Sequence, residues 1–102
     1  MEPKQRQKAR FGLGQVVATP GALEALRRNK STGLEYLQHH ASGDWGVLCK
    51  EDKQVNDDAV RTGARIMSAY FLADETKLWI VTEAADDHGR RAATTFLLPD
   101  DY

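Results

Sequence analysis

A chain of 102 residues has the length of one small domain, and 41% hydrophobic with 28% charged residues is ordinary for a soluble globular protein. The formal net charge of -1 gives the whole molecule no strong attraction to nucleic acid or anionic lipid. The single cysteine, Cys49, excludes an internal disulfide and fits a reducing compartment. No apolar run approaches the roughly 20 residues of a membrane span, and the basic N-terminus lacks the apolar stretch of a signal peptide. We therefore expect a cytoplasmic protein with no membrane segment.

The first ten residues, MEPKQRQKAR, differ in composition from the rest of the chain. Four basic residues alternate there with mostly polar ones: Lys4, Arg6, Lys8 and Arg10. Such a segment has no apolar face to bury, so we predict a flexible basic tail over 1–10 and a single domain over 11–102. The alternative is a basic arm that contacts phosphate or an acidic partner.

The folded part begins with a predicted strand and helix. GQVVAT, residues 14–19, is apolar and rich in β-branched residues, which favours a strand. A helix should follow, because Thr19 suits the N-cap and Pro20 suits the first helical position. Leu23 and Leu26 would form its buried stripe.

The second predicted helix begins near Gly33, because TGLE has the spacing of a capping box. At 100° per residue, its buried stripe would consist of Leu34, Leu37 and Ala41.

A short third helix is predicted over 52–63. Asp52 would cap this helix, and Val55 and Ala59 would share one face. Gly63 would end it in a left-handed conformation.

The second half of the chain contains three predicted strands, at 65–72, 77–84 and 92–99, separated by short polar turns. Short connections favour antiparallel neighbours, so these strands should form a meander. The middle strand is apolar on both faces, which places Trp79 or Ile80 among the most buried residues. The predicted fold is therefore α+β, in the order β-α-α-α-β-β-β, with the meander and the N-terminal strand in an antiparallel sheet and the helices packed on one face.

The stretch HHASGDWG closes the second predicted helix. Helical phasing places His39 in solvent and His40 at the edge of the buried stripe. Gly43 suits a left-handed helix end, and Trp45 returns the chain to the core. Asp44 can satisfy turn amides, and His40 can bond a backbone or carboxylate partner. Neither of these structural roles requires an aspartate or a histidine at these positions. His40 and Asp44 are therefore our first candidates for a functional surface.

Five segments give the sequence a family resemblance: FGLGQVVATPGALEAL, HHASGDWG, GARIMSAY, LWIVTEA and TTFLLPDDY. Together they resemble a family of small proteins from bacterial plasmids and integrative elements, over residues 11–102. Its members are described as plasmid-related or hypothetical proteins, and some carry the label of a type I restriction methyltransferase subunit. The resemblance implies a bacterial protein encoded on mobile DNA, with no settled activity.

The chain departs from this family pattern at two places. An arginine and a histidine precede Gly-Asp-Trp-Gly in the family; His40 matches the histidine, while His39 replaces the arginine. The loop over 84–93 is longer here, with Arg91 in the position of the family arginine and Ala92 in that of a serine.

A methyltransferase is excluded by the order of the predicted elements. A cofactor-binding doubly wound sheet needs several β-α units, which this chain does not supply. The glycines at 12 and 14 precede a strand instead of following one, so they do not form a phosphate loop. Three histidines and one cysteine lack the spacing of a zinc site. We expect neither a cofactor nor a metal.

Two function hypotheses remain. The first is a non-enzymatic accessory protein of mobile genetic elements, a small macromolecule-binding module with a role in counter-defence or element maintenance. Its partner would be a host defence protein, an element-encoded protein, or a nucleic acid reached through the basic tail. The alternative is a metal-free ribonuclease of toxin type with RelE-like topology, and the resemblance to that class is topological only.

Ribonuclease chemistry would need a base, an acid and a cation for the phosphate, and the candidates are His40, Glu83 and Arg91. Glu83 ends the middle predicted strand and Arg91 begins the next, so antiparallel pairing would bring them together. That pair has a simpler interpretation as a cross-strand ion pair. Together with Asp44, these three residues form the candidate functional surface, and we favour the binding module over the enzyme.

Overall fold

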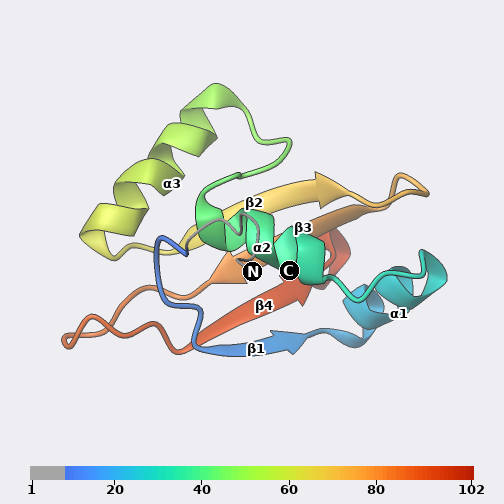
Figure 1. Cartoon of the computed structure of the whole chain (residues 1–102), viewed down its shortest axis with the longest axis horizontal. Coiled ribbons are helices and arrows are strands. Elements are labelled where there is room, and N and C mark those ends of the chain that lie inside the picture. Colours follow the sequence, from blue (N-terminus) through green and yellow to red (C-terminus); the bar gives the residue numbers. More distant parts are fainter. Residues whose placement is uncertain (1–8) are drawn as a thin grey trace, which may run out of the picture.

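The computed structural model describes residues 9–102, and their secondary structure follows the predicted order (Figure 1). The elements are β1 (Gln15–Ala18), α1 (Pro20–Arg28), α2 (Leu34–Ser42), α3 (Lys50–Thr62), β2 (Ile66–Phe71), β3 (Lys77–Thr82), β4 (Ala93–Leu97) and a short 3-10 helix, η1 (Pro99–Asp101). The α+β class is confirmed. The predicted tail falls largely on residues outside the described part of the chain.

The four strands form one sheet in the order β1-β4-β3-β2. The predicted antiparallel meander is confirmed, with β3 between β2 and β4. β1 differs from the prediction, because it runs parallel to β4 and makes the sheet mixed. Three helices and two strands separate β1 from β4 in sequence, and a connection of that length permits parallel pairing.

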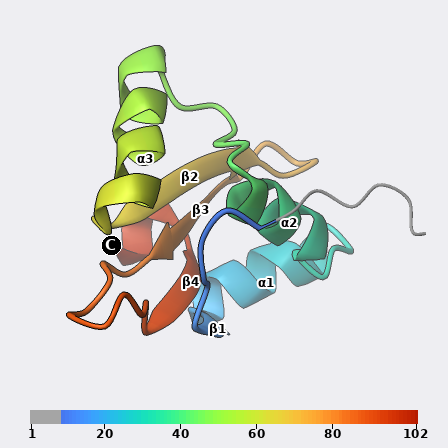
Figure 2. The ribbon, with the colours of Figure 1, turned by 60° about the vertical axis from the view of Figure 1, so that its left-hand side comes forward.

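The helices divide between one face of the sheet and one of its edges. Figure 2 shows α1 and α2 on one side of the sheet, α3 beyond β2, and the C-terminus on the opposite side from α1 and α2. The main core lies beneath α1 and α2, where Leu26 and Phe96 pack with Leu78 and Ile80. Ile80 is completely buried, as predicted for the middle strand, whereas Trp79 points to the other face and is half-buried.

α1 begins as predicted but presents a different face to the core. The Ala22 N–H donates to the Thr19 hydroxyl at 3.1 Å, which confirms the N-cap. Leu23, expected in the buried stripe, is exposed, because the inward positions are those of Ala22, Ala25 and Leu26. A stripe of two small residues lets the helix lie close to the sheet.

The predicted capping box of α2 is wrong. The N-cap residue is Gly33, whose φ of 84° is left-handed, and no side chain caps the helix. The Leu34 N–H instead donates to the Thr32 hydroxyl at 3.3 Å, within a turn that precedes the helix. Leu34 is exposed, while Leu37 and Ala41 keep their predicted inward positions.

α3 is longer at its start than predicted and turned about its axis. It begins two residues before Asp52, after Cys49 at the N-cap, and it ends at Gly63 as predicted. Val55 is exposed, and Asn56 takes the buried position next to Ala59.

Asn56 is buried because its amide completes the outer edge of β2. Its Nδ2 donates to the Met67 carbonyl at 2.6 Å, and its Oδ1 accepts from the Met67 N–H at 3.2 Å. The chain beside it continues this cover, since the Val47 N–H donates to the Ala69 carbonyl at 2.8 Å and the Ala69 N–H to the Trp45 carbonyl at 3.3 Å. β2 therefore has no free hydrogen-bonding edge along these residues.

Replacing Asn56 by alanine should leave both backbone groups of Met67 without this partner. We expect the free energy of unfolding to fall by at least about 2 kcal/mol, since each of the two unsatisfied groups costs about 1–3 kcal/mol. Val55→Ala is the matched control, because Val55 is the exposed neighbour on the same helix, and it should cost less than about 0.5 kcal/mol. Urea denaturation followed by circular dichroism measures both. Equal losses in the two variants would show that the Asn56 amide does not support β2.

Candidate functional site

His40 lies in the last turn of α2 and is completely buried, not at the edge of the stripe where phasing placed it. Its two ring nitrogens contact hydroxyls from two strands: Nδ1 that of Ser68 in β2, and Nε2 that of Thr82 in β3 at 2.8 Å. The Ser68 and Thr82 hydroxyls lie on the sheet under this turn of the helix, and their hydrogen bonds stabilise the imidazole in its buried position.

The direction of the hydrogen bonds fixes the tautomer of His40. The Thr94 hydroxyl donates to the Leu13 carbonyl at 2.7 Å, so its oxygen must accept from the Thr82 hydroxyl, which lies 2.7 Å away. Thr82 has then used its only proton and accepts from His40 Nε2–H. Nδ1 carries no proton and accepts from Ser68. We call this sequence of groups, from Ser68 through His40, Thr82 and Thr94 to the Leu13 carbonyl, the polar chain.

His40 is neutral at physiological pH, because burial lowers the pKa of its imidazole to about 4. Both ring nitrogens are occupied within the polar chain, which ends on a backbone carbonyl. An imidazole held in this way has no access to a substrate. His40 is therefore unavailable for the role in proton transfer that the ribonuclease hypothesis assigned to it.

Arg91 is also buried, and its guanidinium binds backbone oxygens. Nη1 donates to the carbonyls of Ala64 at 2.8 Å and Glu83 at 3.0 Å, and Nη2 donates to the carbonyl of Ala59 at 3.0 Å. These bonds join the C-terminal end of α3, which favours a cation, to the end of β3. Burial lowers the pKa of Arg91 without removing its charge. The predicted cross-strand ion pair is wrong, because Arg91 contacts the backbone of Glu83 and not its carboxylate.

The two acidic candidates are exposed. The Asp44 carboxylate lies beside the His39 ring, with 3.0 Å between Oδ2 and Nδ1, and its Oδ1 accepts weakly from the Gly46 N–H at 3.4 Å. The second contact agrees with the turn-amide alternative. Glu83 extends from the end of β3 into solvent. Within residues 9–102, no hydrogen bond or ion pair joins the side chains of two of the four candidates.

Phe11 is the residue that the sequence analysis missed, and it lies between the two buried candidates. Its ring stacks on Trp45 with 6.0 Å between centroids and meets the His40 ring edge-on at 5.3 Å. The Arg91 guanidinium carbon lies 5.6 Å from the Phe11 centroid. A lone aromatic residue directly after a basic segment was the available signal. Phe11 thus anchors the start of the domain.

Arg10, assigned to the tail by composition, contacts the domain. Its N–H donates to the Ala41 carbonyl at 2.8 Å, and its Nη1 lies 3.9 Å from Asp57 Oδ1. The ordered contacts therefore begin at least one residue before the predicted boundary.

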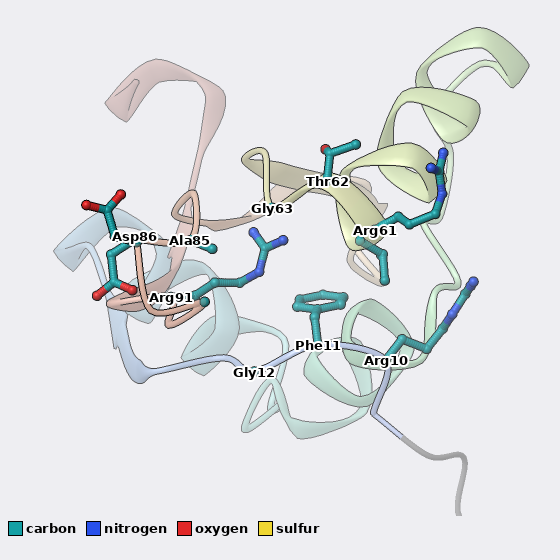
Figure 3. Close-up of a pocket in the computed structure, with 12 residues that line it drawn as sticks. Arg10, Phe11, Gly12, Arg61, Thr62, Gly63, Ala85, Asp86 and Arg91 are labelled. Atoms are coloured by element: carbon teal, nitrogen blue, oxygen red, sulfur yellow. The ribbon is translucent and has the colours of Figure 1, made fainter.

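A cavity of about 440 Å³ opens beside Phe11 and Arg91 (Figure 3). Arg10 and Arg61 extend on one side of it, Asp86 lies on the other, and Arg91 lies between them. Asp86 Oδ1 is occupied by the N–H groups of His88 at 2.8 Å and Arg90 at 2.9 Å. Asp86 and Arg91, which line this cavity, are therefore both engaged in hydrogen bonds within the fold.

The opposite face of the sheet is different, because neither α1 nor α2 covers it. Side chains alternate along each strand, so Phe71, Lys77 and Trp79 point away from these helices. In the pairing of β2 with β3, Phe71 lies opposite Lys77, and Ala69 lies opposite Trp79. Phe71 and Trp79 are therefore diagonal neighbours. The Trp79 ring meets the Tyr102 ring edge-on, with 5.6 Å between centroids. These rings form one row across the sheet.

A cation lies at each end of this row. Lys77 Nζ is 5.5 Å from the Phe71 centroid, and the Arg65 guanidinium carbon is 5.5 Å from the Tyr102 centroid. Phe71 is 51% and Tyr102 68% exposed, so both rings remain accessible. We call the surface formed by Arg65, Phe71, Lys77, Trp79 and Tyr102 the open sheet face.

No protein-family model, curated protein or solved structure matches this chain. In the described part of the chain, no group of three or more His, Cys, Asp or Glu side chains is placed to hold a metal ion. None of the helices over residues 9–102 has the length and apolarity needed to cross a bilayer.

His40 should make the stability of the domain sensitive to acid. Its folded pKa of about 4 lies below the ordinary value of 6.5, so protonation favours the unfolded chain. The contribution is complete above pH 6.5 and is lost as the pH falls toward 4, by about 3 kcal/mol in total. His40→Asn cannot titrate, so the difference in unfolding free energy between wild type and this variant should shrink by that amount.

Urea denaturation at pH 7.5, 5.5 and 4 measures this difference. His88→Asn is the control, since it removes a histidine that is exposed in the loop after β3 and leaves the buried ring in place. A constant difference for His40→Asn would mean that the buried imidazole does not resist protonation.

Proposed function

We propose that this chain is a non-enzymatic binding module that holds single-stranded nucleic acid on the open sheet face. The observation that carries the proposal is the row of Phe71, Trp79 and Tyr102, in which Phe71 and Tyr102 are exposed and a cation lies at each end. Aromatic side chains on a sheet stack with unpaired bases, and neighbouring cations contact the phosphates.

The buried polar groups support a binding role over catalysis. His40, Asn56, Ser68, Thr82, Arg91 and Thr94 are the buried polar or charged side chains of residues 9–102. Each is engaged in hydrogen bonds within the fold, and no buried side-chain nitrogen or oxygen there lacks a partner. The accessible chemistry of the molecule therefore lies on its surface.

Charge favours stacking over phosphate attraction as the main source of affinity. The net charge is -1, and the open sheet face carries two cations, Arg65 and Lys77. Each phosphate contact on a single strand contributes a slope of about -0.7 to the dependence of log K on log salt. Two contacts give a shallow slope of about -1.4, and any contribution from the basic segment before Phe11 would make it steeper.

The cellular setting of the proposal rests on the family resemblance. We place the chain in the bacterial cytoplasm as an accessory protein of mobile genetic elements, where such binding would serve counter-defence or element maintenance. A protein partner from the host or the element is the competing occupant of the open sheet face. Aromatic residues and arginine are enriched at protein interfaces too, so the test must separate the two.

The test is binding of fluorescent twelve-residue oligo-dT and oligo-U, followed by anisotropy. Phe71→Leu and Tyr102→Leu keep an apolar side chain but remove a flat ring. Since stacking contributes about 1–3 kcal/mol per base, each variant should bind roughly 5- to 150-fold more weakly than wild type. Leu23→Ala, at an exposed position on α1, should bind as wild type does.

Two results would overturn this function. Wild type that leaves both oligonucleotides free at about 100 µM, the weak end of non-specific nucleic-acid binding, would assign the open sheet face to a protein partner. Leucine variants that bind as tightly as wild type would show that the nucleic acid binds elsewhere, with the basic segment the next site to test.

A further inference from the structure

The two edges of the sheet, β2 and β1, differ in how far other parts of the chain cover them. The β2 edge is covered by the Asn56 amide and by the chain from Trp45 to Val47. Among residues 9–102, no segment covers the β1 edge in this way (Figure 1), and Val16 and Val17 are 43% and 41% exposed. An exposed edge strand is a template for another strand, and monomeric proteins usually block it.

The outward hydrogen-bonding groups of β1 follow from its pairing. The Gln15 N–H donates to the Ala92 carbonyl and the Thr19 N–H to the Phe96 carbonyl, so the odd-numbered residues face β4. Val16 and Ala18 alternate with them and direct their N–H and C=O groups away from the sheet. Neither makes a backbone hydrogen bond outside the β1–β4 pairing to any described residue.

The sequence of this edge suits a second copy of the same strand. No charged residue occurs from Phe11 to Leu23, so two copies bring no like charges together. The usual devices against pairing, a lysine or a proline within the strand, are absent from β1, Gln15–Ala18. Two valines in four residues favour extended pairing.

Antiparallel pairing about Val17 satisfies every free group of the strand. Val16 of one copy then faces Ala18 of the other, twice, which gives four hydrogen bonds, and the two Val17 side chains lie next to each other. We propose that two copies of this chain pair in this way through β1 to form a two-fold symmetric dimer with one continuous sheet.

The dimer would also affect the open sheet face. The two-fold axis of such a pairing is perpendicular to the sheet, so the open sheet faces of both copies lie on the same side. A long ligand could contact both, which raises its effective affinity. The pairing does not depend on the proposed ligand, because it uses only the β1 edge.

Analytical ultracentrifugation of the full chain tests the dimer. Wild type should reach twice the mass of one chain, 11.4 kDa, by about 1 mM, the range of weak association. Val17→Lys places two cations side by side at the axis and should stay at the mass of one chain. Val55→Lys, at an exposed valine on α3, is the matched control and should dimerise as wild type does.

Amide exchange by NMR on the wild-type chain gives a test that needs no variant. Exchange at the Val16 and Ala18 amides should slow as concentration rises, with no such change at exposed amides of α3. Three results would overturn the dimer. The wild type could remain at the mass of one chain up to about 1 mM, or a folded Val17→Lys variant could still dimerise. Exchange at the Val16 and Ala18 amides could also be independent of concentration. Each of these results leaves the open sheet face of a single copy available for nucleic acid.

Discussion

The polar chain through His40 is the interaction on which the rest of the structure depends. It joins α2 to β2 and β3 through the ring, and β4 to the segment before β1 through Thr94 and the Leu13 carbonyl. A neutral imidazole with both nitrogens bonded can sit in the core at little cost, whereas the same ring with one nitrogen unpaired would destabilise it. The hydroxyls and the ring must therefore be placed together, and that requirement fixes how α2 lies on the sheet.

The buried polar side chains of this molecule serve its fold, and we look for its function among the exposed ones. His40 and Arg91 are the two buried candidates, and the fold uses both: one in the polar chain, the other at the end of α3. Phe11 packs between them and closes the core at that point. We propose that a partner binds the open sheet face, where Phe71 and Tyr102 are exposed beside Lys77 and Arg65. This division is the physical basis for proposing a binding module.

Local sequence pattern predicted the elements and their order but not the polar chain. Apolar runs joined by short polar turns identified the meander, and Gly43 and Gly63 marked the ends of two helices as expected. The position of His40 could not be predicted in the same way, because Ser68 and Thr82 come from separate strands and meet only through the register of the sheet.

The Glu83–Arg91 prediction shows the same limit. Strand pairing did bring these two residues together, as expected, but the carbonyls at the end of α3 bind the guanidinium in place of the carboxylate. The position of α3 relative to β3 depends on the whole fold, so it cannot be predicted from the local sequence pattern. Phe71 and Trp79 likewise become neighbours only through the pairing of β2 with β3.

The protonation state of His40 tests the central claim most directly. Long-range nitrogen–proton correlation NMR on ¹⁵N-labelled protein distinguishes the two neutral tautomers from the imidazolium. We expect a neutral ring with its proton on Nε2 at pH 7, unchanged down to about pH 5, because the pKa of His40 is about 4. A proton on Nδ1, or a ring that titrates near the ordinary value of 6.5, would contradict the polar chain and return His40 to the list of functional candidates.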